Sequence, residues 1–271
     1  MQPVRLIALD MDGTLLSGKG IISKENVNAI KKAQQAGVIV AICSGRFPEN
    51  ASMVIKEYDL HCPVIGTNGC AITLEPMGAC VSLHKMDKKA SVQAFEILDA
   101  MDAYYFLFGH KMVVTSDVNV FHHSELSKRQ TELTDIRFTH GRNAVIDALE
   151  EGICKYYVTI DDKVLQKRGE LEAIQNVVLT SSGPSNIEIM PKGIDKGTGI
   201  LELANHYNIP MESVMAMGDQ DNDLPMLTRV GYGVAMGNAP MEIKQQVRYE
   251  TLHCSDHGVA HAIERFVFGK E

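Results

Sequence analysis

Two aspartates, Asp10 and Asp12, stand two positions apart where the first apolar run of the chain, residues 6–9, ends. That run has the length and composition of a buried parallel strand. Both carboxylates face one crevice at the strand end if the chain turns directly after Asp10, and Gly13 permits such a turn. One carboxylate can then attack phosphorus while the other donates a proton to the leaving oxygen and later takes one from water. A calcium loop is the alternative, but Thr14 and the leucines after it stand where that loop needs oxygen ligands.

A serine, a glycine and an arginine, Ser44, Gly45 and Arg46, follow the next predicted strand, residues 38–43. The carboxyl ends of parallel strands meet at one edge of a sheet, so this segment opens onto the same crevice. A hydroxyl and the backbone N–H of a glycine make a suitable cradle for a phosphate oxygen. Because serine and glycine are also common in plain turns, the segment by itself does not indicate a site.

Three acidic residues, Asp219, Asp221 and Asp223, occupy five positions after a predicted strand at 213–217. Two unit charges about 4 Å apart repel by roughly 4 kcal/mol at an effective dielectric of 20. A hard divalent cation offsets this repulsion, and Mg²⁺ takes one or two carboxylates together with phosphate and water. Asp219 is nearest the strand end, so we expect it to be the ligand.

Lys196 opens a predicted helix in the last third of the chain. A lysine at a helix N-terminus gains nothing from the helix dipole, so its position calls for an anion such as phosphate or the carboxylate of Asp10. Lys192 is close enough to compete for this role. A solvated surface lysine is the alternative, since most lysines are exposed.

The elements that must position these residues alternate between strand and helix. Ser23 and Gly37 bound the first predicted helix, and Pro48 opens the second. The predicted strands of this part are residues 6–9, 38–43 and 63–67, and alternation returns after residue 190. A β-α-β-α-β order predicts an α/β fold with a doubly wound, Rossmann-like parallel sheet. A hairpin at 71–74 and 79–83 precedes an α+β insert at about 84–190.

Bulk composition narrows the class of partner. The 271 residues carry a net charge of −8 and no basic run, so we expect no nucleic acid partner. No apolar stretch approaches the length of a membrane-spanning helix, and the N-terminus lacks the pattern of a signal peptide. The six cysteines form no C-x-x-C pair and are expected to be buried free thiols, Cys43 among them. We therefore expect a cytoplasmic monomer or small homo-oligomer with no membrane attachment.

Four motifs in order, D-M-D-G-T-L, C-S-G-R, D-K-G and G-D-Q-D-N-D, resemble those of the haloacid dehalogenase-like (HAD) superfamily. Within it, the chain is similar to the Cof-like sugar-phosphate phosphatases. The resemblance covers about residues 3–82 and 191–271. It implies a discontinuous catalytic core at 1–83 and 191–271, with an inserted α/β cap domain of type C2 at 84–190. It also implies a Mg²⁺-dependent hydrolase of small phosphorylated metabolites.

The resemblance implies roles residue by residue. Asp10 would be the nucleophile that forms an aspartyl-phosphate, and Asp12 the general acid/base. Mg²⁺ would be held by Asp10, the backbone carbonyl of Asp12 and Asp219, with Asp223 in support. The phosphate would contact the backbone at Met11 and the residues Ser44, Gly45, Lys196 and Asn222. The dehalogenases of the superfamily work without metal and lack the second aspartate, so Asp12 favours phosphoryl chemistry.

Two other functions are alternatives to a phosphatase. A phosphomutase would use the same site but return the phosphate to its substrate. A receiver-like signalling module would be phosphorylated on aspartate, but such modules are usually shorter and lack a cap and a second aspartate placed for hydrolysis. The pair His122 and His123 in the insert could touch substrate, although cap packing is the simpler interpretation.

Overall fold

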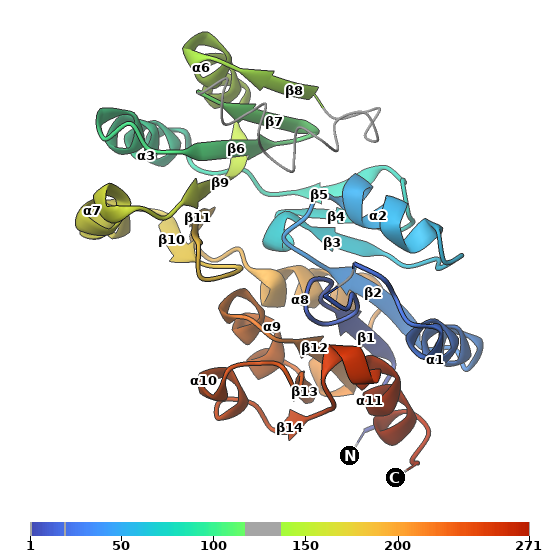
Figure 1. Ribbon diagram of the computed structural model, residues 1–271. Coiled ribbons are helices and arrows are strands. Elements are labelled where there is room, and N and C mark those ends of the chain that lie inside the picture. Colours follow the sequence, from blue (N-terminus) through green and yellow to red (C-terminus); the bar gives the residue numbers. More distant parts are fainter. Residues whose placement is uncertain (1, 19, 117–136, 271) are drawn as a thin grey trace. The chain divides into compact units, whose positions relative to one another are not determined.

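A computed structural model describes residues 2–18, 20–116 and 137–270, which form two compact units (Figure 1). The core unit comprises residues 1–82 and 194–271, and the inserted unit comprises residues 83–193. The α/β class predicted from the alternating pattern is confirmed. His122 and His123 lie outside the described residues.

The core unit is built on an eight-stranded sheet in the order β14-β13-β12-β1-β2-β3-β4-β5. Its strands are β1 Leu6–Leu9, β2 Ile39–Cys43, β3 Val64–Gly66, β4 Ala71–Thr73, β5 Cys80–Leu83, β12 Val214–Gly218, β13 Tyr232–Ala235 and β14 Tyr249–Glu250. From β14 to β3 all neighbours are parallel, and β4 is antiparallel to β3. The chain moves outward from β1 through β2 to β3 and then returns to β12 on the other side of β1. This reversal of strand order is where open α/β sheets bind ligands.

Successive side chains of a strand point to opposite faces of the sheet, and in this core both faces are apolar. Helices therefore cover both faces. The helices are α1 Lys24–Gln35, α2 Pro48–Lys56, α8 Lys196–His206, α9 Leu224–Arg229, α10 Met241–Lys244 and α11 Gly258–Phe266. Ile7 and Leu9 of β1 pack in one buried cluster with α1 and α11. Leu6 and Ala8 pack in a second cluster with Ile200 of α8. The strand run is therefore apolar on both sides, as its sequence predicted.

Local signals set the ends of the elements as expected. The hydroxyl of Ser23 accepts from the backbone N–H of Asn26 at 3.2 Å and caps α1. Gly37, with φ +85°, follows the end of α1, and Pro48 is the first residue of α2. Lys196 opens α8 directly after Asp195, whose carboxylate accepts from the backbone N–H of Thr198 at 2.8 Å.

The inserted unit has a six-stranded sheet in the order β10-β11-β9-β6-β7-β8. Its elements are α3 Lys88–Ala100, β6 Tyr105–Gly109, β7 Met112–Thr115, β8 Arg137–His140, α6 Arg142–Glu151, β9 Ile153–Thr159, α7 Asp162–Glu172, β10 Val177–Thr180 and β11 Asn186–Pro191. Side chains of α3, α6 and α7 join those of the sheet in one buried cluster. Lys155 and Glu188 form a buried ion pair between neighbouring strands β9 and β11, with Nζ 2.9 Å from Oε1.

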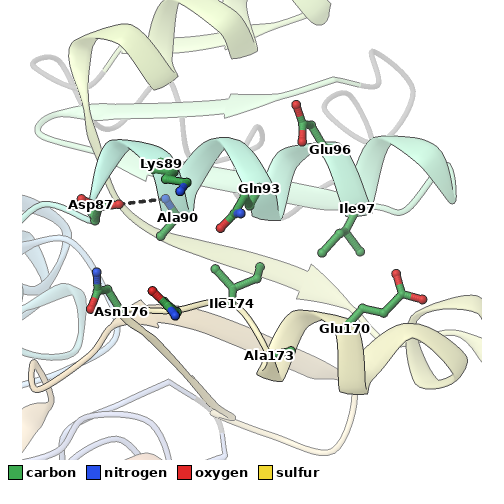
Figure 2. Close-up of a pocket in the computed structure, with 11 residues that line it drawn as sticks. Asp87, Lys89, Ala90, Gln93, Glu96, Ile97, Glu170, Ala173, Ile174 and Asn176 are labelled. Carbon is green, nitrogen blue, oxygen red and sulfur yellow. Dashed lines mark hydrogen bonds between the residues drawn. The ribbon is translucent and has the colours of Figure 1, made fainter.

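A hollow of about 550 Å³ lies along α3 and the segment from α7 to β10 in the inserted unit (Figure 2). Asp87, Glu96 and Glu170 line it together with Lys89, and Ile174 adds an apolar surface. None of the residues predicted to do chemistry lines this hollow. The predicted site has to be sought at the strand ends of the core unit.

A few predicted elements differ in extent. Thr67 was expected to end the third strand but begins a 3₁₀ turn, with φ +51° at Thr67 and +56° at Asn68. The helix α10 starts at Met241, after the extended Pro240. The short strands β8 and β14 were not predicted. A 3₁₀ turn, Asp221–Asp223, precedes α9.

Candidate functional site

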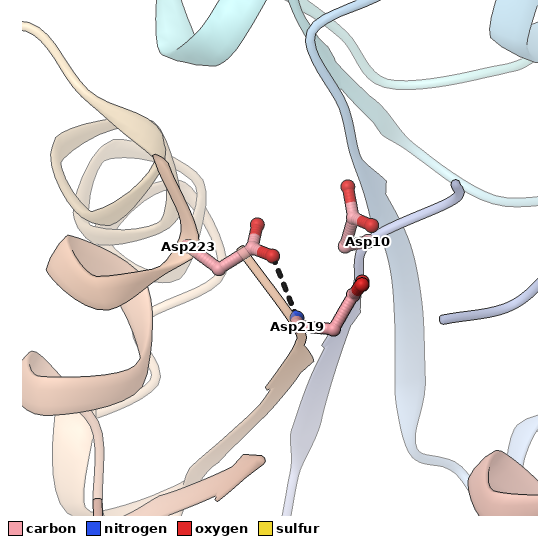
Figure 3. A group of neighbouring side chains, drawn as sticks. All are labelled: Asp10, Asp219 and Asp223. Atoms are coloured by element: carbon pink, nitrogen blue, oxygen red, sulfur yellow. Dashed lines mark hydrogen bonds between the residues drawn. The ribbon is translucent and has the colours of Figure 1, made fainter. Parts of the chain in front are cut away.

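Three aspartates from opposite ends of the chain meet at the point where β1 and β12 end (Figure 3). Leu9 and Met217 are paired in the register of these strands, and the backbone N–H of Asp10 donates to the carbonyl of Met217 at 3.0 Å. Carboxylate oxygens of Asp10, Asp219 and Asp223 lie within 4.8 Å of one another, and all three residues are buried. Acidic residues from both ends of the chain thus converge at one edge of the sheet.

Lys196 lies between two of these carboxylates. Its ammonium is 2.6 Å from Oδ1 of Asp10 and 2.6 Å from Oδ1 of Asp223, and the side chain is 1% exposed. Lys196 is therefore neither a solvated surface lysine nor interchangeable with Lys192, which is exposed. Three carboxylates and one ammonium leave a formal charge of −2 when all four groups are ionised.

Asp223 holds the loop that carries Asp219. Its Oδ2 accepts from the backbone N–H groups of Asp219 and Gln220 at 2.8 and 2.9 Å. With Oδ1 bound to Lys196, both oxygens of Asp223 already have donors. Asp223 is thus placed to fix the loop, whereas Asp221, in the same 3₁₀ turn, is exposed.

Polar neighbours orient the carboxylate of Asp219. Oδ1 accepts from the hydroxyl of Thr14 at 3.0 Å, and Oδ2 accepts from the amides of Gln220 and Asn238, each at 3.1 Å. Gly13 has φ +87°, and a Cβ on it would lie 2.4 Å from Oδ2 of Asp219. The turn after β1 thus needs glycine for its conformation and for the space that Asp219 occupies.

The cluster shifts the pKa of its own members. Burial raises the pKa of Asp10 well above its ordinary value, and Asp223 and Asp219 raise it further, while Lys196 lowers it. Burial also raises the pKa of Asp219 to about 6, with a further contribution from Asp223. Burial lowers the pKa of Lys196, but Asp10 and Asp223 outweigh burial and raise it well above its ordinary value. These shifts mark a crowded group of negative charges in which a cation would be stabilising.

Ser44 follows β2 and Asn222 follows β12, the two strands that flank β1 in the sheet. Ser44 is 1% exposed and accepts the backbone N–H of Arg46 at 3.2 Å. The amide of Asn222 donates to Oδ1 of Asn68 at 3.2 Å, and the backbone N–H of Asn68 donates to the carbonyl of Ser44 at 3.0 Å. The ends of β2, β3 and β12 are therefore joined by one chain of hydrogen bonds.

Two further predicted phosphate contacts lie beside these residues. Gly45 is half-buried next to Ser44, and Met11 is fully buried directly after Asp10.

Asp12 does not join the buried group. Its side chain is 62% exposed and receives two hydrogen bonds from the guanidinium of Arg46, at 2.8 Å from Nε and 2.6 Å from Nη2. The sequence therefore located Asp12 near the crevice but did not predict the partner of its carboxylate.

The sequence did not predict several side-chain contacts of the site. Thr14, Gln220 and Asn238 orient Asp219, and Arg46 holds Asp12. Asn238 follows the strand β13, so the rule that polar residues after parallel strands face the crevice would have found it. Cys43 is a buried residue of β2, as predicted, and burial raises the pKa of its thiol, which argues against a nucleophilic role.

A largely parallel open sheet with carboxylates at its point of reversal is typical of a ligand-binding α/β protein, and comparison with known proteins specifies the family. The sequence pattern of the haloacid dehalogenase-like hydrolases matches residues 7–263. The chain therefore belongs to this family, and the resemblance found in its motifs is confirmed. It is a phosphatase of the HAD superfamily.

Curated relatives and solved structures match along almost the whole chain. The 5-amino-6-(5-phospho-D-ribitylamino)uracil phosphatase YwtE of Bacillus subtilis (strain 168) is 31% identical, over 98% of this chain and 99% of its own length. The phosphatase YwpJ of the same strain is 29% identical, over 97% and 100%. The structure of a haloacid dehalogenase-like hydrolase from B. subtilis, 29% identical, superposes with a TM-score of 0.83 over 96% of this chain and 99% of that one. Among the described residues, no helix is long and apolar enough to cross a membrane.

Proposed function

We propose that the protein hydrolyses phosphate monoesters of small metabolites in a Mg²⁺-dependent reaction through an aspartyl-phosphate on Asp10. The observation that carries the proposal is the convergence of Asp10, Asp219 and Asp223 at the reversal point of the sheet, where one buried ammonium contacts the first and the last of them. Phosphate monoesters are among the least reactive substrates in water, with enzymatic accelerations of up to ~10²¹. Covalent catalysis and electrostatic stabilisation have to act together to reach such rates.

Asp10 is the nucleophile in this proposal. Its carboxylate oxygen attacks phosphorus, a new P–O bond forms, and the bond to the leaving oxygen breaks. Although burial raises its pKa, the ammonium of Lys196 at 2.6 Å favours the ionised form that the attack requires. Lys196 thereby ties the nucleophile to the loop of Asp223, which holds Asp219 in place.

Asp12 is the general acid/base. In its protonated form it donates a proton to the leaving oxygen as the ester bond breaks. Its carboxylate then takes a proton from the water that attacks the aspartyl-phosphate, which releases inorganic phosphate and restores both aspartates. Asp12 belongs to the same turn as Asp10 and is exposed, which suits a group that exchanges protons with water.

The donor set fits Mg²⁺. Asp10, Asp219 and the backbone carbonyl of Asp12 would supply hard oxygen ligands, and Asp223 holds the loop that carries Asp219. The formal charge of −2 on the four buried groups matches a divalent cation, and the close approach of Gly13 to Asp219 leaves the carboxylate no bulky neighbour there. When bound, the ion would neutralise charge that develops on the phosphoryl oxygens.

The remaining residues are assigned to phosphate binding and shielding. Ser44, Gly45, Asn222 and the backbone at Met11 offer hydroxyl, amide and N–H donors for the phosphoryl oxygens, together with Lys196. The inserted unit, residues 83–193, would act as the cap that excludes water during attack.

The name of a relative indicates the substrate class. YwtE is named for a phosphorylated ribitylamino compound. We infer that a phosphorylated sugar or sugar-alcohol derivative is the substrate.

Phosphate release tests this function. Purified protein with Mg²⁺ is offered sugar phosphates, sugar-alcohol phosphates, nucleotides and pyridoxal phosphate, with and without EDTA. We expect release of inorganic phosphate that EDTA abolishes and that Asp10→Asn lowers by more than ~10⁴-fold, beyond the loss of an acid/base group. Asp221→Asn changes an exposed aspartate of the same motif and serves as the matched control. Near wild-type turnover by Asp10→Asn would refute the proposal, and isomerised sugar phosphate without free phosphate would identify a mutase instead.

A further inference from the structure

We propose that Arg46 is a positioning residue that holds the carboxylate of Asp12 in the single orientation from which it serves the leaving oxygen. This inference rests on the proposed function, since it assigns a partner to the general acid/base. Neither the motifs nor the comparisons give Arg46 a role.

The contact between the two side chains is bidentate. Nε and Nη2 of Arg46 donate to Oδ2 and Oδ1 of Asp12 at 2.8 and 2.6 Å, so both carboxylate oxygens are engaged by one planar fork. The side chain of Asp12 is 62% exposed, whereas that of Arg46 is only 20% exposed. The arginine is the better fixed partner, and the aspartate is the one that gains order from the pair.

Arg46 itself is held on three sides. Its Nη1 donates to Oδ1 of Asn50 in α2 at 3.2 Å, and its backbone N–H donates to the hydroxyl of Ser44 at 3.2 Å. Its carbonyl accepts from the backbone N–H of Thr67 at 2.7 Å. The guanidinium therefore transfers the rigidity of the ends of β2 and β3 to a side chain on the turn after β1.

Stability alone does not account for such a pair. Ion pairs at this exposure contribute about 0–1 kcal/mol to folding, because water screens the charges and both side chains lose freedom. Orientation has a far larger effect on catalysis, where a misplacement of about 1 Å costs roughly 10²-fold in rate. The arrangement is therefore better explained by the proton transfer that Asp12 performs.

Asp12 is the group that gives and takes the proton in both steps. Protonated Asp12 gives its proton to the ester oxygen as that oxygen leaves phosphorus with the bonding electrons, and the resulting carboxylate is the form that accepts both bonds from Arg46. The same carboxylate then takes a proton from the attacking water. Arg46 exchanges no proton in either step, since guanidinium stays charged in proteins.

Substrates whose leaving groups differ in basicity show whether Arg46 acts by positioning the general acid Asp12. Only a basic leaving group needs the proton that Asp12 donates. An alkyl phosphate that the wild type hydrolyses needs a proton on its leaving oxygen, whereas 2,4-dinitrophenyl phosphate releases a stable phenolate without one. We expect Arg46→Ala to lower kcat/KM for the alkyl ester by about 10²-fold and for the dinitrophenyl ester by less than about 3-fold. Arg46→Lys, which keeps the charge but lacks the planar fork, should fall between them on the alkyl ester.

A double variant and a control variant make the test specific for the pair of Arg46 with Asp12. In an Asp12→Asn background, Arg46→Ala should cause no further loss on the alkyl ester, because the group that it positions is gone. Lys32→Ala is the matched control, since the ammonium of Lys32 also contacts both oxygens of a carboxylate at a partly exposed position, Glu264, at 2.6 and 2.9 Å. It should leave both esters unchanged.

The outcomes distinguish a role of Arg46 in positioning Asp12 from a role in binding the phosphoryl group. Equal losses on both esters would overturn the proposal and indicate that Arg46 binds the phosphoryl group. Additive losses in the double variant would also overturn it. If Arg46→Ala does not fold, Arg46→Lys gives the same contrast. Wild-type protein that hydrolyses neither ester, or Asp10→Asn that hydrolyses both, would count against the proposed function rather than against the role of Arg46.

Discussion

The ammonium of Lys196 lies 2.6 Å from Oδ1 of Asp10, although 186 positions separate the two residues in the chain. The contact joins the N-terminal part of the core unit to the part that follows the insert. The same ammonium contacts Asp223 at the same distance, so one buried cation stabilises two buried carboxylates. Breaking such an arrangement leaves uncompensated charge in the interior.

Lys196→Met should therefore destabilise the metal-free protein. Removal of one partner from a buried ion pair typically costs 3–5 kcal/mol, so we expect a loss of about 3 kcal/mol or more in the free energy of unfolding. Turnover should fall by at least ~10²-fold, as for other lost donors to developing charge. Urea unfolding in EDTA and phosphate release measure the two effects.

Lys32→Met is the control for Lys196→Met. The pair of Lys32 with Glu264 is about a third exposed on each side, so its loss should cost at most about 1 kcal/mol and leave turnover intact. Equal destabilisation by the two variants would show that burial of the charges at Lys196 has no special consequence.

Asp219→Asn should make the metal-free protein more stable and at the same time abolish its stabilisation by Mg²⁺. Mg²⁺ stabilises whichever state binds it, so it should raise the Tm of the wild type but not that of the variant. Without metal the variant should be the more stable protein at pH 7.5, because it lacks one of three crowded carboxylates. Thermal unfolding with Mg²⁺ and with EDTA checks both statements.

The pH dependence of the metal-free protein follows from the same carboxyl. The pKa of Asp219 is raised to about 6 in the folded protein, so the folded state holds this proton more tightly than the unfolded state. The stability contributed by that proton is present in full below about pH 4 and is lost as pH rises through about 6. Asp219→Asn should flatten this part of the profile, whereas Asp221→Asn, at an exposed position of the same motif, should not.

The left-handed turn at Gly13 has a consequence for activity that an ordinary turn glycine lacks. Gly13→Ala places a Cβ where Oδ2 of Asp219 lies, and Gly37→Ala meets nothing within 4 Å at nearly the same φ, +85°. Both variants should lose about 1–2 kcal/mol of stability from backbone strain. Only Gly13→Ala should also weaken the Mg²⁺-dependent rise in Tm and the rate of phosphate release. If both variants keep full activity, the contact with Asp219 has no functional role.

The sequence predicted the location of the site better than its internal contacts. Asp10, Ser44 and Asp219 could be placed at one sheet edge because each follows a buried apolar strand, and the strand order of an α/β sheet brings such ends together. The pair of Asp12 with Arg46 and the bonds of Asn238 to Asp219 depend on side-chain orientation, which local pattern does not determine. The left-handed Thr67 was likewise unpredictable, since tertiary contacts impose that conformation on a β-branched residue.

A last prediction concerns the inserted unit, where Lys155 and Glu188 are each 2% exposed and 2.9 Å apart. Lys155→Met leaves the carboxylate of Glu188 buried without its ammonium, so we expect a loss of about 3–5 kcal/mol in the free energy of unfolding. The double variant Lys155→Met/Glu188→Leu removes both charges and should recover much of that loss. Lys88→Met is the matched control in the same unit, because its pair with Glu150 is more than half exposed and should contribute less than about 1 kcal/mol. Urea unfolding of the four proteins measures these differences, and a double variant no more stable than Lys155→Met would mean that the pair is not what makes the loss of Lys155 costly.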